Sequence, residues 1–464
     1  MKKMFIALLL LSSLGAQAAP QVLPEAVQDA LKRAGIPINS VGIWVQEKNA
    51  PAPLLNINGA RAMNPASTMK LLTTTSALVS LTPAYRWKTE VYLDGKLDNG
   101  VLQGNLVFKG YGDPKLTIEQ FWLWMLELRQ RGLREIRGDV VLDTRYFAPL
   151  QHDPAEFDND PTRAYNVGPN ALLLNFNALH LRLIPNGVTT TALLEPQLSG
   201  YVVQNCVRTS TKLACHPNDA YSAHLEGRVI VLQGEIAADC GEVDDYFSLL
   251  PHEQYFYAAF VALWQELGGS VYGKVRAGNA PNDALPFSTH QSTSAAEIIR
   301  DINKFSNNIM ARHVFLSVSG QDGVPASPLR SAAFVQQWLL NQGLNFPELV
   351  LENGAGLSRK ERISPQHLAQ LLQYAAVSPY SAELQASLPI LGIDGTVKKR
   401  FKDCELTGHA HLKTGTLDGV KSIAGYVDAQ SGKQWIMVFI INHANAARGQ
   451  AAQDALIDWL DKNY

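Results

Sequence analysis

The sequence predicts a discontinuous fold of the α/β (α+β) class, in which one domain is built from both ends of the chain. Helix and strand patterns dominate up to residue 86 and again from residue 288, whereas residues 87–287 are rich in short strands broken by Gly, Pro, Asn and Asp. A chain of 464 residues is also too long for one ordinary core. We therefore predict an α/β domain of residues 19–86 and 288–464, interrupted by a β-rich insertion of residues 87–287.

The N-terminal residues predict a secretory signal peptide. A start with two lysines is followed by the apolar run Phe5–Leu11 and by the small-residue sequence Ala16-Gln17-Ala18. These features are typical of cleaved signals, and the apolar run is too short for a permanent membrane anchor. We predict that residues 1–18 are removed and that the mature chain is exported; an uncleaved anchor is the alternative. No later segment has enough consecutive apolar residues to cross a membrane.

The first part of the α/β domain begins with a helix and two strands. Leu23–Ala34 has helical periodicity and ends at a glycine, and apolar runs predict strands at Val41–Glu47 and Leu54–Ile57. A second helix is predicted over Ser67–Leu81, because a proline two residues later prevents it from continuing.

The insertion opens with the strongest hairpin signal in the chain. Alternating runs at Trp87–Leu93 and Val101–Lys109 flank Asn99-Gly100, a dipeptide favoured in two-residue hairpin turns. Thr117 is placed to cap the amphipathic helix that follows, and many short strands come next. A further long helix is predicted over Gln254–Leu267.

The second part of the α/β domain combines helices with a hairpin. Ser364 as cap, with Pro365 at the first helical position, supports the helix Ser364–Ala376. The predicted elements are a helix starting at Ser294, helices Leu329–Asn341 and Ser364–Ala376, strands Ser422–Val427 and Gln434–Asn442, and a closing helix Ala446–Lys462.

The charge balance and the four cysteines indicate which macromolecular partners, disulfides and metal sites to expect. The 40 basic and 42 acidic residues nearly balance, which gives no reason to expect nucleic acid or an anionic membrane surface as a partner. Cys206, Cys215, Cys240 and Cys404 can form disulfides in an exported protein, and we favour Cys206–Cys215, although four cysteines permit three connectivities. No metal is expected, because the spacings are not Cys-x-x-Cys and no paired histidines lie alongside.

Ser67-Thr68-Met69-Lys70 is the first of three motifs that carry chemistry. Residues three apart share a helix face, so this spacing brings the lysine amine close to the serine hydroxyl. Ser67 becomes a good nucleophile only when a base takes its proton. Lys70 can be that base only if burial and nearby positive charge, which Lys413 can supply, lower its pKa from about 10.4. A helix-capping serine with an exposed lysine is the alternative.

Ser306-Asn307-Asn308 is the second motif, and it follows a helix that we expect Phe305 to help pack. Ser306 can relay a proton between Lys70 and a leaving group. The amide of Asn308 can hold the lysine or a substrate carbonyl with fixed donors and acceptors. A polar helix end facing solvent is the alternative for this motif alone.

Lys413-Thr414-Gly415-Thr416 is the third motif, and it precedes an apolar strand. Gly415 leaves room for a substrate backbone to lie close along that strand. Lys413, Thr414 and Thr416 can bind a terminal carboxylate. The N–H of Thr416 can pair with that of Ser67 as an oxyanion hole. A turn at a strand edge is the alternative for this motif alone.

In this order, the three motifs resemble the active site of the serine penicillin-recognising enzymes. The chain resembles the low-molecular-mass class C penicillin-binding proteins, the peptidase S13 family of D-alanyl-D-alanine carboxypeptidases and endopeptidases, over nearly its whole mature length. The wide interval between the first two motifs leaves room for an inserted module, unlike in β-lactamases. Further shared strings are Gly110-Tyr111-Gly112-Asp113-Pro114, Asn353-Gly354-Ala355-Gly356-Leu357-Ser358-Arg359, Gly392-Ile393-Asp394-Gly395-Thr396, Leu417-Asp418-Gly419-Val420 and Ala424-Gly425-Tyr426.

The resemblance implies a penicillin-binding, serine β-lactamase-like α/β domain, with helices on both faces of an antiparallel sheet and two subdomains nested in the insertion. It implies no metal and no organic cofactor. The catalytic residues that it implies are Ser67 as nucleophile, Lys70 as the base for acylation and Ser306 as proton relay. The substrate-binding residues that it implies are Asn308, Lys413, Thr414, Gly415 and Thr416.

The resemblance is less complete at Leu174-Asn175-Phe176-Asn177. Some relatives present an aspartate there toward the side chain of the substrate's third residue, whereas this chain has Asn175. Asn175 and Phe176 are therefore candidate substrate contacts without a carried-over charge preference. A position in the core is the alternative for Phe176.

The function that the resemblance implies is that of a serine DD-peptidase acting on peptidoglycan stem peptides. Attack of Ser67 on the penultimate D-alanine would release D-alanine, as a carboxypeptidase, or open a D-Ala-meso-diaminopimelate cross-link, as an endopeptidase. β-Lactam antibiotics would acylate and inhibit the same serine. The expected location is the periplasm, without a transmembrane anchor, and a homodimer is one alternative for the oligomeric state.

Two other functions use the same fold. A β-lactamase commonly places a glutamate for deacylation through a Glu-x-x-Leu-Asn loop, and the sequence has no such string. A non-catalytic peptidoglycan-binding module would be expected to have lost a motif residue, and none is missing. The sequence therefore favours the peptidase.

Overall fold

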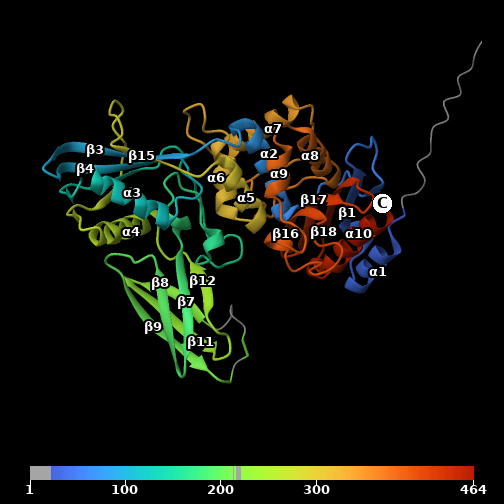
Figure 1. The fold of residues 1–464 in the computed structure, drawn as a ribbon, viewed down its shortest axis with the longest axis horizontal. Coiled ribbons are helices and arrows are strands. Elements are labelled where there is room, and N and C mark those ends of the chain that lie inside the picture. Colours follow the sequence, from blue (N-terminus) through green and yellow to red (C-terminus); the bar gives the residue numbers. More distant parts are fainter. Residues whose placement is uncertain (1–21, 213, 216–220) are drawn as a thin grey trace, which may run out of the picture.

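The computed structural model describes residues 22–212, 214–215 and 221–464, and the predicted signal peptide lies outside these residues. Figure 1 shows two parts side by side. Blue, orange and red segments from the two ends of the chain form one part, and cyan to yellow-green segments from the middle form the other. The discontinuous α/β architecture predicted from the sequence is confirmed.

A five-stranded antiparallel sheet forms the centre of the α/β part. Its strand order is β16-β17-β18-β1-β2, so strands from the C-terminal segment lie beside strands from the N-terminal segment. In register, Val41 pairs with Ile441 and Leu417 with Val420. The strands are β1 (Val41–Glu47), β2 (Leu55–Ile57), β16 (Ala410–Leu417), β17 (Val420–Asp428) and β18 (Gln434–Asn442).

Helices cover both faces of this sheet, and the alternation of side chains along each strand explains how. In β18, Ile436 and Val438 face one hydrophobic cluster, whereas Met437 and Phe439 face the other. The first cluster packs against α2 (Lys70–Leu81), α5 (Ala295–Phe305), α6 (Asn308–Ser317), α7 (Pro328–Asn341), α8 (Pro365–Val377) and α9 (Ser381–Ser387). The second packs against α1 (Glu25–Ala34) and α10 (Gln450–Asn463).

A seven-stranded sheet begins the insertion. The predicted hairpin at Asn99-Gly100 forms its centre, and β6 and β14 extend it on one side. Its strands are β3 (Lys88–Asp98), β4 (Val101–Gly110), β5 (Glu135–Ile136), β6 (Val140–Asp143), β13 (Ser270–Val271), β14 (Val275–Ala277) and β15 (Ser288–Gln291). Helices α3 (Ile118–Gln130), which has the predicted cap at Thr117, and α4 (His252–Glu266) pack on it.

A six-stranded sheet completes the insertion and extends away from the rest of the molecule (Figure 1). Its order is β10-β11-β9-β8-β7-β12. Its strands are β7 (Leu179–Asn186), β8 (Thr189–Glu195), β9 (Val202–Ser210), β10 (Tyr221–Glu226), β11 (Val229–Ala237) and β12 (Val243–Phe247). Both insertion sheets contribute to one hydrophobic cluster, so their division into two subdomains stays a prediction. Strand β15, which the sequence assigned to the α/β domain, pairs with β3 of the insertion.

The favoured disulfide Cys206–Cys215 is wrong, because the structure joins Cys215 to Cys240. Cys206 lies within β9, where extended backbone carries it away from the end of the strand. Strands β9 and β11 run parallel and end together, which brings the segments that leave them within reach of each other. Cys206 and Cys404 are exposed free thiols. The sequence spacing favoured the shortest loop and could not show this pairing of strands.

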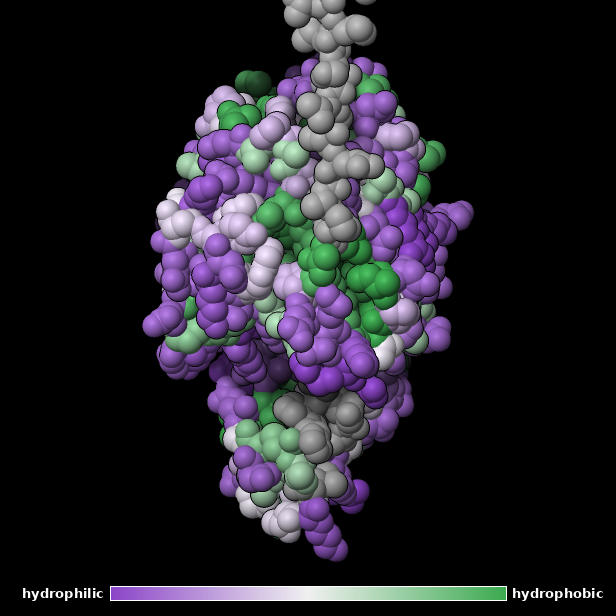
Figure 2. Space-filling model, turned by 90° about the vertical axis from the view of Figure 1, so that its right-hand side faces the viewer, coloured by the Kyte–Doolittle hydropathy of each residue, from purple (hydrophilic) through white to green (hydrophobic). Residues whose placement is uncertain are grey.

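One face of the molecule and the described helices bear on the prediction that the mature chain has no membrane anchor. Figure 2 shows the α/β part as a mostly hydrophilic surface with one hydrophobic band near the centre of that face. Within the residues that the structure describes, no helix has both the length and the apolar character needed to span a bilayer.

Candidate active site

Ser67 lies in a tight 3-10 helix, η2 (Ala66–Met69), directly before α2. Ala66 has a positive φ of 45°, an uncommon conformation for a residue with a side chain, so the turn before the serine is strained. Lys70 begins α2, and its Nζ lies 2.9 Å from Ser67 Oγ. The predicted i, i+3 contact is therefore present.

Lys70 is fully buried, and its Nζ is held by three acceptors. It donates to Ser67 Oγ, to Asn308 Oδ1 at 2.6 Å and to the carbonyl of Ala355. Burial, followed by the positive charge of Lys413, lowers the pKa of Lys70 well below its usual value. The environment therefore favours the neutral amine, which is the form that can take a proton from Ser67.

The second motif lies between two helices. Ser306 ends α5 in a left-handed conformation with φ of 58°, and Asn307 caps α6 by accepting from Met310 N at 2.9 Å. Asn308 is the first residue of α6, which points its amide toward Lys70. Phe305, expected to help pack the helix, has a 69% exposed side chain and lies on the surface instead.

The third motif lies inside β16, the edge strand of the sheet, and it precedes the apolar strand β17 as predicted. The sequence did not predict that the motif itself forms a strand. Lys413 is fully buried, and its Nζ donates to Ser306 Oγ at 2.8 Å and to the carbonyl of Thr414 at 2.9 Å. Burial lowers the pKa of Lys413 to about 7. The lysine therefore connects the third motif to the second.

Gly415 lets β16 lie against the serine turn. A Cβ at this position would come within 2.8 Å of Ser67 N and would also clash with Ser422 Oγ. The backbone of the third motif therefore approaches the backbone of Ser67 closely. The oxyanion hole predicted from the N–H groups of Ser67 and Thr416 stays a prediction.

The loop Asn353–Arg359 contacts Lys70, because the carbonyl of Ala355 accepts a hydrogen bond from Lys70 Nζ. Gly356 has a φ of 77°, and a Cβ there would lie 2.8 Å from Ser67 N and clash with Ala66 O. The buried carboxylate of Glu361 accepts hydrogen bonds from three backbone N–H groups at the start of this loop. The donors are Glu352 N at 3.0 Å, Asn353 N at 2.9 Å and Gly354 N at 3.1 Å. Burial outweighs these hydrogen bonds and raises the pKa of Glu361.

The motifs meet at one cavity of about 370 Å³. Five of the predicted residues line it, namely Ser67, Ser306, Asn308, Thr414 and Thr416, and Lys70 and Lys413 lie buried behind them. The sequence did not point to six further lining residues: Leu357, Thr396, Arg400, Leu417, Lys421 and Gln450. Leu357, Thr396 and Leu417 lie in strings shared with the family, which could have indicated them; Arg400, Lys421 and Gln450 had no such signal.

Asn175 and Phe176 do not line this cavity. Both have positive φ values in a short turn of the insertion. Asn175 Oδ1 accepts from Ile118 N at 3.3 Å, and its Nδ2 donates to the carbonyl of Ala178 at 3.1 Å and to Tyr255 OH at 3.2 Å. The Phe176 side chain packs against the hydrophobic core. These contacts give both residues a role in the fold.

Comparison with known proteins shows the family to which the chain belongs. Residues 23–463 match the D-Ala-D-Ala carboxypeptidase 3 (S13) family. The chain belongs to this family. It is 27% identical over 418 residues to the D-alanyl-D-alanine carboxypeptidase DacB of Haemophilus influenzae. This alignment covers 87% of this chain and 85% of the Haemophilus protein.

Solved structures of S13 proteins share the fold. The crystal structure of penicillin binding protein 4 (dacB) from Haemophilus influenzae matches with a TM-score of 0.79 and 25% identity, covering 95% of this chain and all of that one. The same protein complexed with a novel β-lactam matches with a TM-score of 0.74 and 24% identity, over 94% of this chain and 100% of that one. As a member of the S13 family, the chain is a serine DD-peptidase with a penicillin-binding fold.

Proposed function

We propose that Ser67 is the nucleophile and Lys70 the base for acylation. Ser67 Oγ bonds to the carbonyl carbon of the penultimate D-alanine while Lys70 Nζ takes its proton. The peptide C–N bond breaks, and Ser306 passes a proton to the departing amine. Water then hydrolyses the ester and frees Ser67.

The observation that carries this proposal is the contact of the fully buried Lys70 amine with the Ser67 hydroxyl. A lysine at its ordinary pKa would be a cation at neutral pH and could not accept a proton. Lys70 lies 2.9 Å from Ser67 Oγ, and its pKa is lowered by burial and by Lys413. Two buried ammonium groups repel each other, so the positive charge of Lys413 favours the neutral form of Lys70.

The remaining motif residues hold the substrate. Asn308 fixes Lys70 and Lys413 fixes Ser306, so both reacting side chains have one preferred position. Thr414 and Thr416 offer hydroxyl groups and strand backbone to the substrate along the edge of the sheet. Gly415 permits that approach. The substrates are peptidoglycan stem peptides, cut as a carboxypeptidase at D-Ala-D-Ala and as an endopeptidase at D-Ala-meso-diaminopimelate cross-links.

β-Lactams fit the same site, because a strained lactam amide presents a carbonyl to Ser67 and a carboxylate to the third motif. The Haemophilus influenzae protein, which is similar over nearly the whole chain, has been crystallised with a β-lactam.

The signal peptide predicted from residues 1–18 sends the protein to the periplasm. A homodimer is the alternative to a monomer, and sedimentation of the mature protein distinguishes them.

Intact mass of the mature protein, followed over time after addition of benzylpenicillin, tests the proposal. We expect a lasting penicilloyl adduct that maps to Ser67 and is absent from Ser67→Ala. Release of D-alanine from a D-Ala-D-Ala peptide should disappear in the same variant. A short-lived adduct with rapid loss of penicillin would indicate a β-lactamase. No adduct and no peptide turnover would indicate a non-catalytic peptidoglycan-binding module.

A further inference from the structure

One cation that lines the catalytic cavity, Lys421, has no side-chain partner among the residues that the structure describes. Lys421 follows the hairpin turn between β16 and β17 and lines the cavity together with Thr414 and Thr416. Its side chain is half-buried. Within the described residues, no carboxylate lies within ion-pair distance of its ammonium group, and no acceptor lies within hydrogen-bond distance. An ammonium group in this position has lost part of its water without gaining a counter-ion.

The register of the hairpin places Lys421 beside the third motif. Lys421 pairs directly with Thr416 across β16 and β17, and the pair Leu417–Val420 closes a two-residue turn next to it. Residues paired in this way project from the same face, with Cβ atoms about 5 Å apart. The ammonium group of Lys421 therefore belongs to the same end of the cavity as the Thr416 hydroxyl.

The other charges around Lys421 leave it free for a ligand. Arg400 also lines the cavity, but its guanidinium donates to the carboxylate of Asp454, with Nε to Oδ1 at 2.7 Å. Burial, followed by the positive charge of Arg400, lowers the pKa of Lys421, and Asp454 opposes this only in part. Among these three groups the positive charges outnumber the negative one, so an anion would complete the site.

The lysine of the third motif does not fill this role. Lys413 does not line the cavity, because its Nζ is directed to Ser306 Oγ and to the carbonyl of Thr414. The sequence analysis expected Lys413 to bind the terminal carboxylate. Because Lys413 does not line the cavity, a carboxylate bound there cannot contact its ammonium group directly. Lys421 lies on the next strand and is accessible.

We propose that Lys421 binds the carboxylate of the leaving group and sets the preference of the enzyme for substrates that carry one. This inference rests on the proposed peptidase function. A departing D-alanine and the departing end of a cross-link both bear a carboxylate on the carbon next to the amine that leaves. Thr416 donates a hydroxyl hydrogen bond, and Lys421 supplies the positive charge. A leaving group without a carboxylate gains nothing from Lys421.

The test compares two peptides that end in D-Ala-D-Ala, one with a free carboxylate and one with a C-terminal carboxamide. For the wild-type enzyme we expect kcat/KM to be roughly tenfold to a hundredfold higher for the free acid, the range of a charge-assisted hydrogen bond. Lys421→Met should lower kcat/KM for the acid to the level of the amide and leave the amide unchanged. Lys421→Arg, which keeps the charge, should retain the preference.

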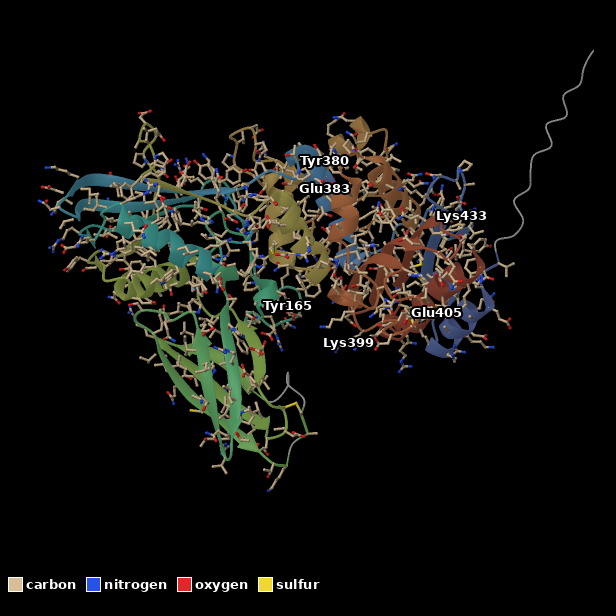
Figure 3. The ribbon with its side chains drawn as sticks, in the orientation of Figure 1. Tyr165, Tyr380, Glu383, Lys399, Glu405 and Lys433 are labelled. Atoms are coloured by element: carbon tan, nitrogen blue, oxygen red, sulfur yellow. A yellow bond between two sulfur atoms is a disulfide. The ribbon has the colours of Figure 1, made fainter. Side chains whose placement is uncertain are left out.

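Lys399→Met is the matched control, because it removes a lysine that is exposed at the lower edge of the α/β part in Figure 3 and does not line the cavity. It should leave both rates unchanged. A wild-type enzyme that cuts both peptides equally would overturn the role of Lys421 while the peptidase function stands. An equal loss on both peptides in Lys421→Met would assign Lys421 to the fold. Failure of the wild-type enzyme to cut either peptide would overturn the peptidase function and this inference together.

Discussion

The Glu90 cluster of the insertion and the lysine pair of the active site both bury charge, but they treat it in opposite ways. In the insertion, the carboxylate of Glu90 accepts hydrogen bonds from Lys88 Nζ at 2.7 Å, Tyr92 OH at 2.6 Å and Tyr111 OH at 2.7 Å. Burial alone would raise the pKa of Glu90, but these three donors outweigh it and hold the pKa below its usual value. The charge is fully matched, and the cluster stabilises the fold.

In the active site the buried charges are not matched. Lys70 and Lys413 are both fully buried, and within the part of the chain that the structure describes no carboxylate lies within ion-pair distance of either. Their pKa values fall, so the site loses protons where ordinary lysines would keep them. The difference teaches that a buried charge with partners serves stability, whereas a buried charge without them serves proton transfer.

Replacing Lys70 should give the largest effect and the clearest contrast with Glu90. Lys70→Met removes the proposed base, and we expect the rate of acylation by benzylpenicillin to fall roughly a thousandfold. The folded protein should be no less stable, because a lysine with a lowered pKa costs stability at neutral pH, and this cost disappears with the side chain. Intact mass gives the rate and thermal unfolding gives the stability. A clear fall in melting temperature would show that Lys70 also stabilises the fold.

Lys413→Met tests whether the two lysines are coupled through their charge. We expect acylation to slow roughly a hundredfold, because Ser306 loses the donor that fixes it. The pKa of Lys70 should rise once the neighbouring positive charge is gone, so the acidic limb of the pH–rate profile should move to higher pH.

Lys421→Met is the control for that charge effect, since Lys421 lines the same cavity but is not among the charges that shift the pKa of Lys70. The acidic limb of the pH–rate profile of Lys421→Met should coincide with that of the wild-type enzyme. An unmoved limb in Lys413→Met would mean that burial alone sets the pKa of Lys70.

Glu90→Gln breaks the matched cluster of the insertion. We expect the free energy of unfolding to fall by about 2 kcal/mol at pH 7, because two tyrosines and one lysine lose a charged acceptor. A carboxylate with a lowered pKa gives its stability above its unfolded pKa and loses it as pH falls through its folded pKa. The difference between variant and wild type should therefore shrink toward acidic pH. Denaturant unfolding at several pH values measures it, and a constant difference would contradict the charge-based account.

Local patterns predicted much of the fold because they report local physics. The β1 and β18 boundaries agree with the predicted strands Val41–Glu47 and Gln434–Asn442, since continuous apolar runs mark strands buried on both faces. The predicted cap at Ser364 is present, because its side chain accepts from His367 N. Strand β16 was missed because a polar catalytic motif occupies an edge strand, where the apolar pattern is broken.

Other features depend on contacts between segments that are far apart in the sequence, and local patterns could not predict them. The pairing of Cys215 with Cys240 follows from two parallel strands that end together. Lys421 enters the active site only through its register with Thr416, and Glu361 comes near Lys70 only through the loop Asn353–Arg359. The three motifs were recognisable because their chemistry requires particular residue types, whereas such supporting residues can be of many types.

Glu361→Gln should give the smallest effect and tests the one carboxylate that opposes the lowered pKa of Lys70. The charge of Glu361 raises the pKa of Lys70, so its removal should lower that pKa and move the acidic limb of acylation to lower pH. The movement should be smaller than the opposite movement in Lys413→Met, because Lys413 is the larger influence. Glutamine keeps an oxygen for the three backbone N–H groups, so the loop should stay folded.

Glu352→Gln is the matched control for Glu361→Gln, because Glu352 lies in the same loop region but binds Ser358 and Lys360 and does not shift the pKa of Lys70. Its limb should coincide with that of the wild type in pH–rate profiles measured with benzylpenicillin. A limb that moves to higher pH in Glu361→Gln would show that the loop, and not the charge, controls Lys70. The active site would then depend on how the loop holds the Ala355 carbonyl against the lysine.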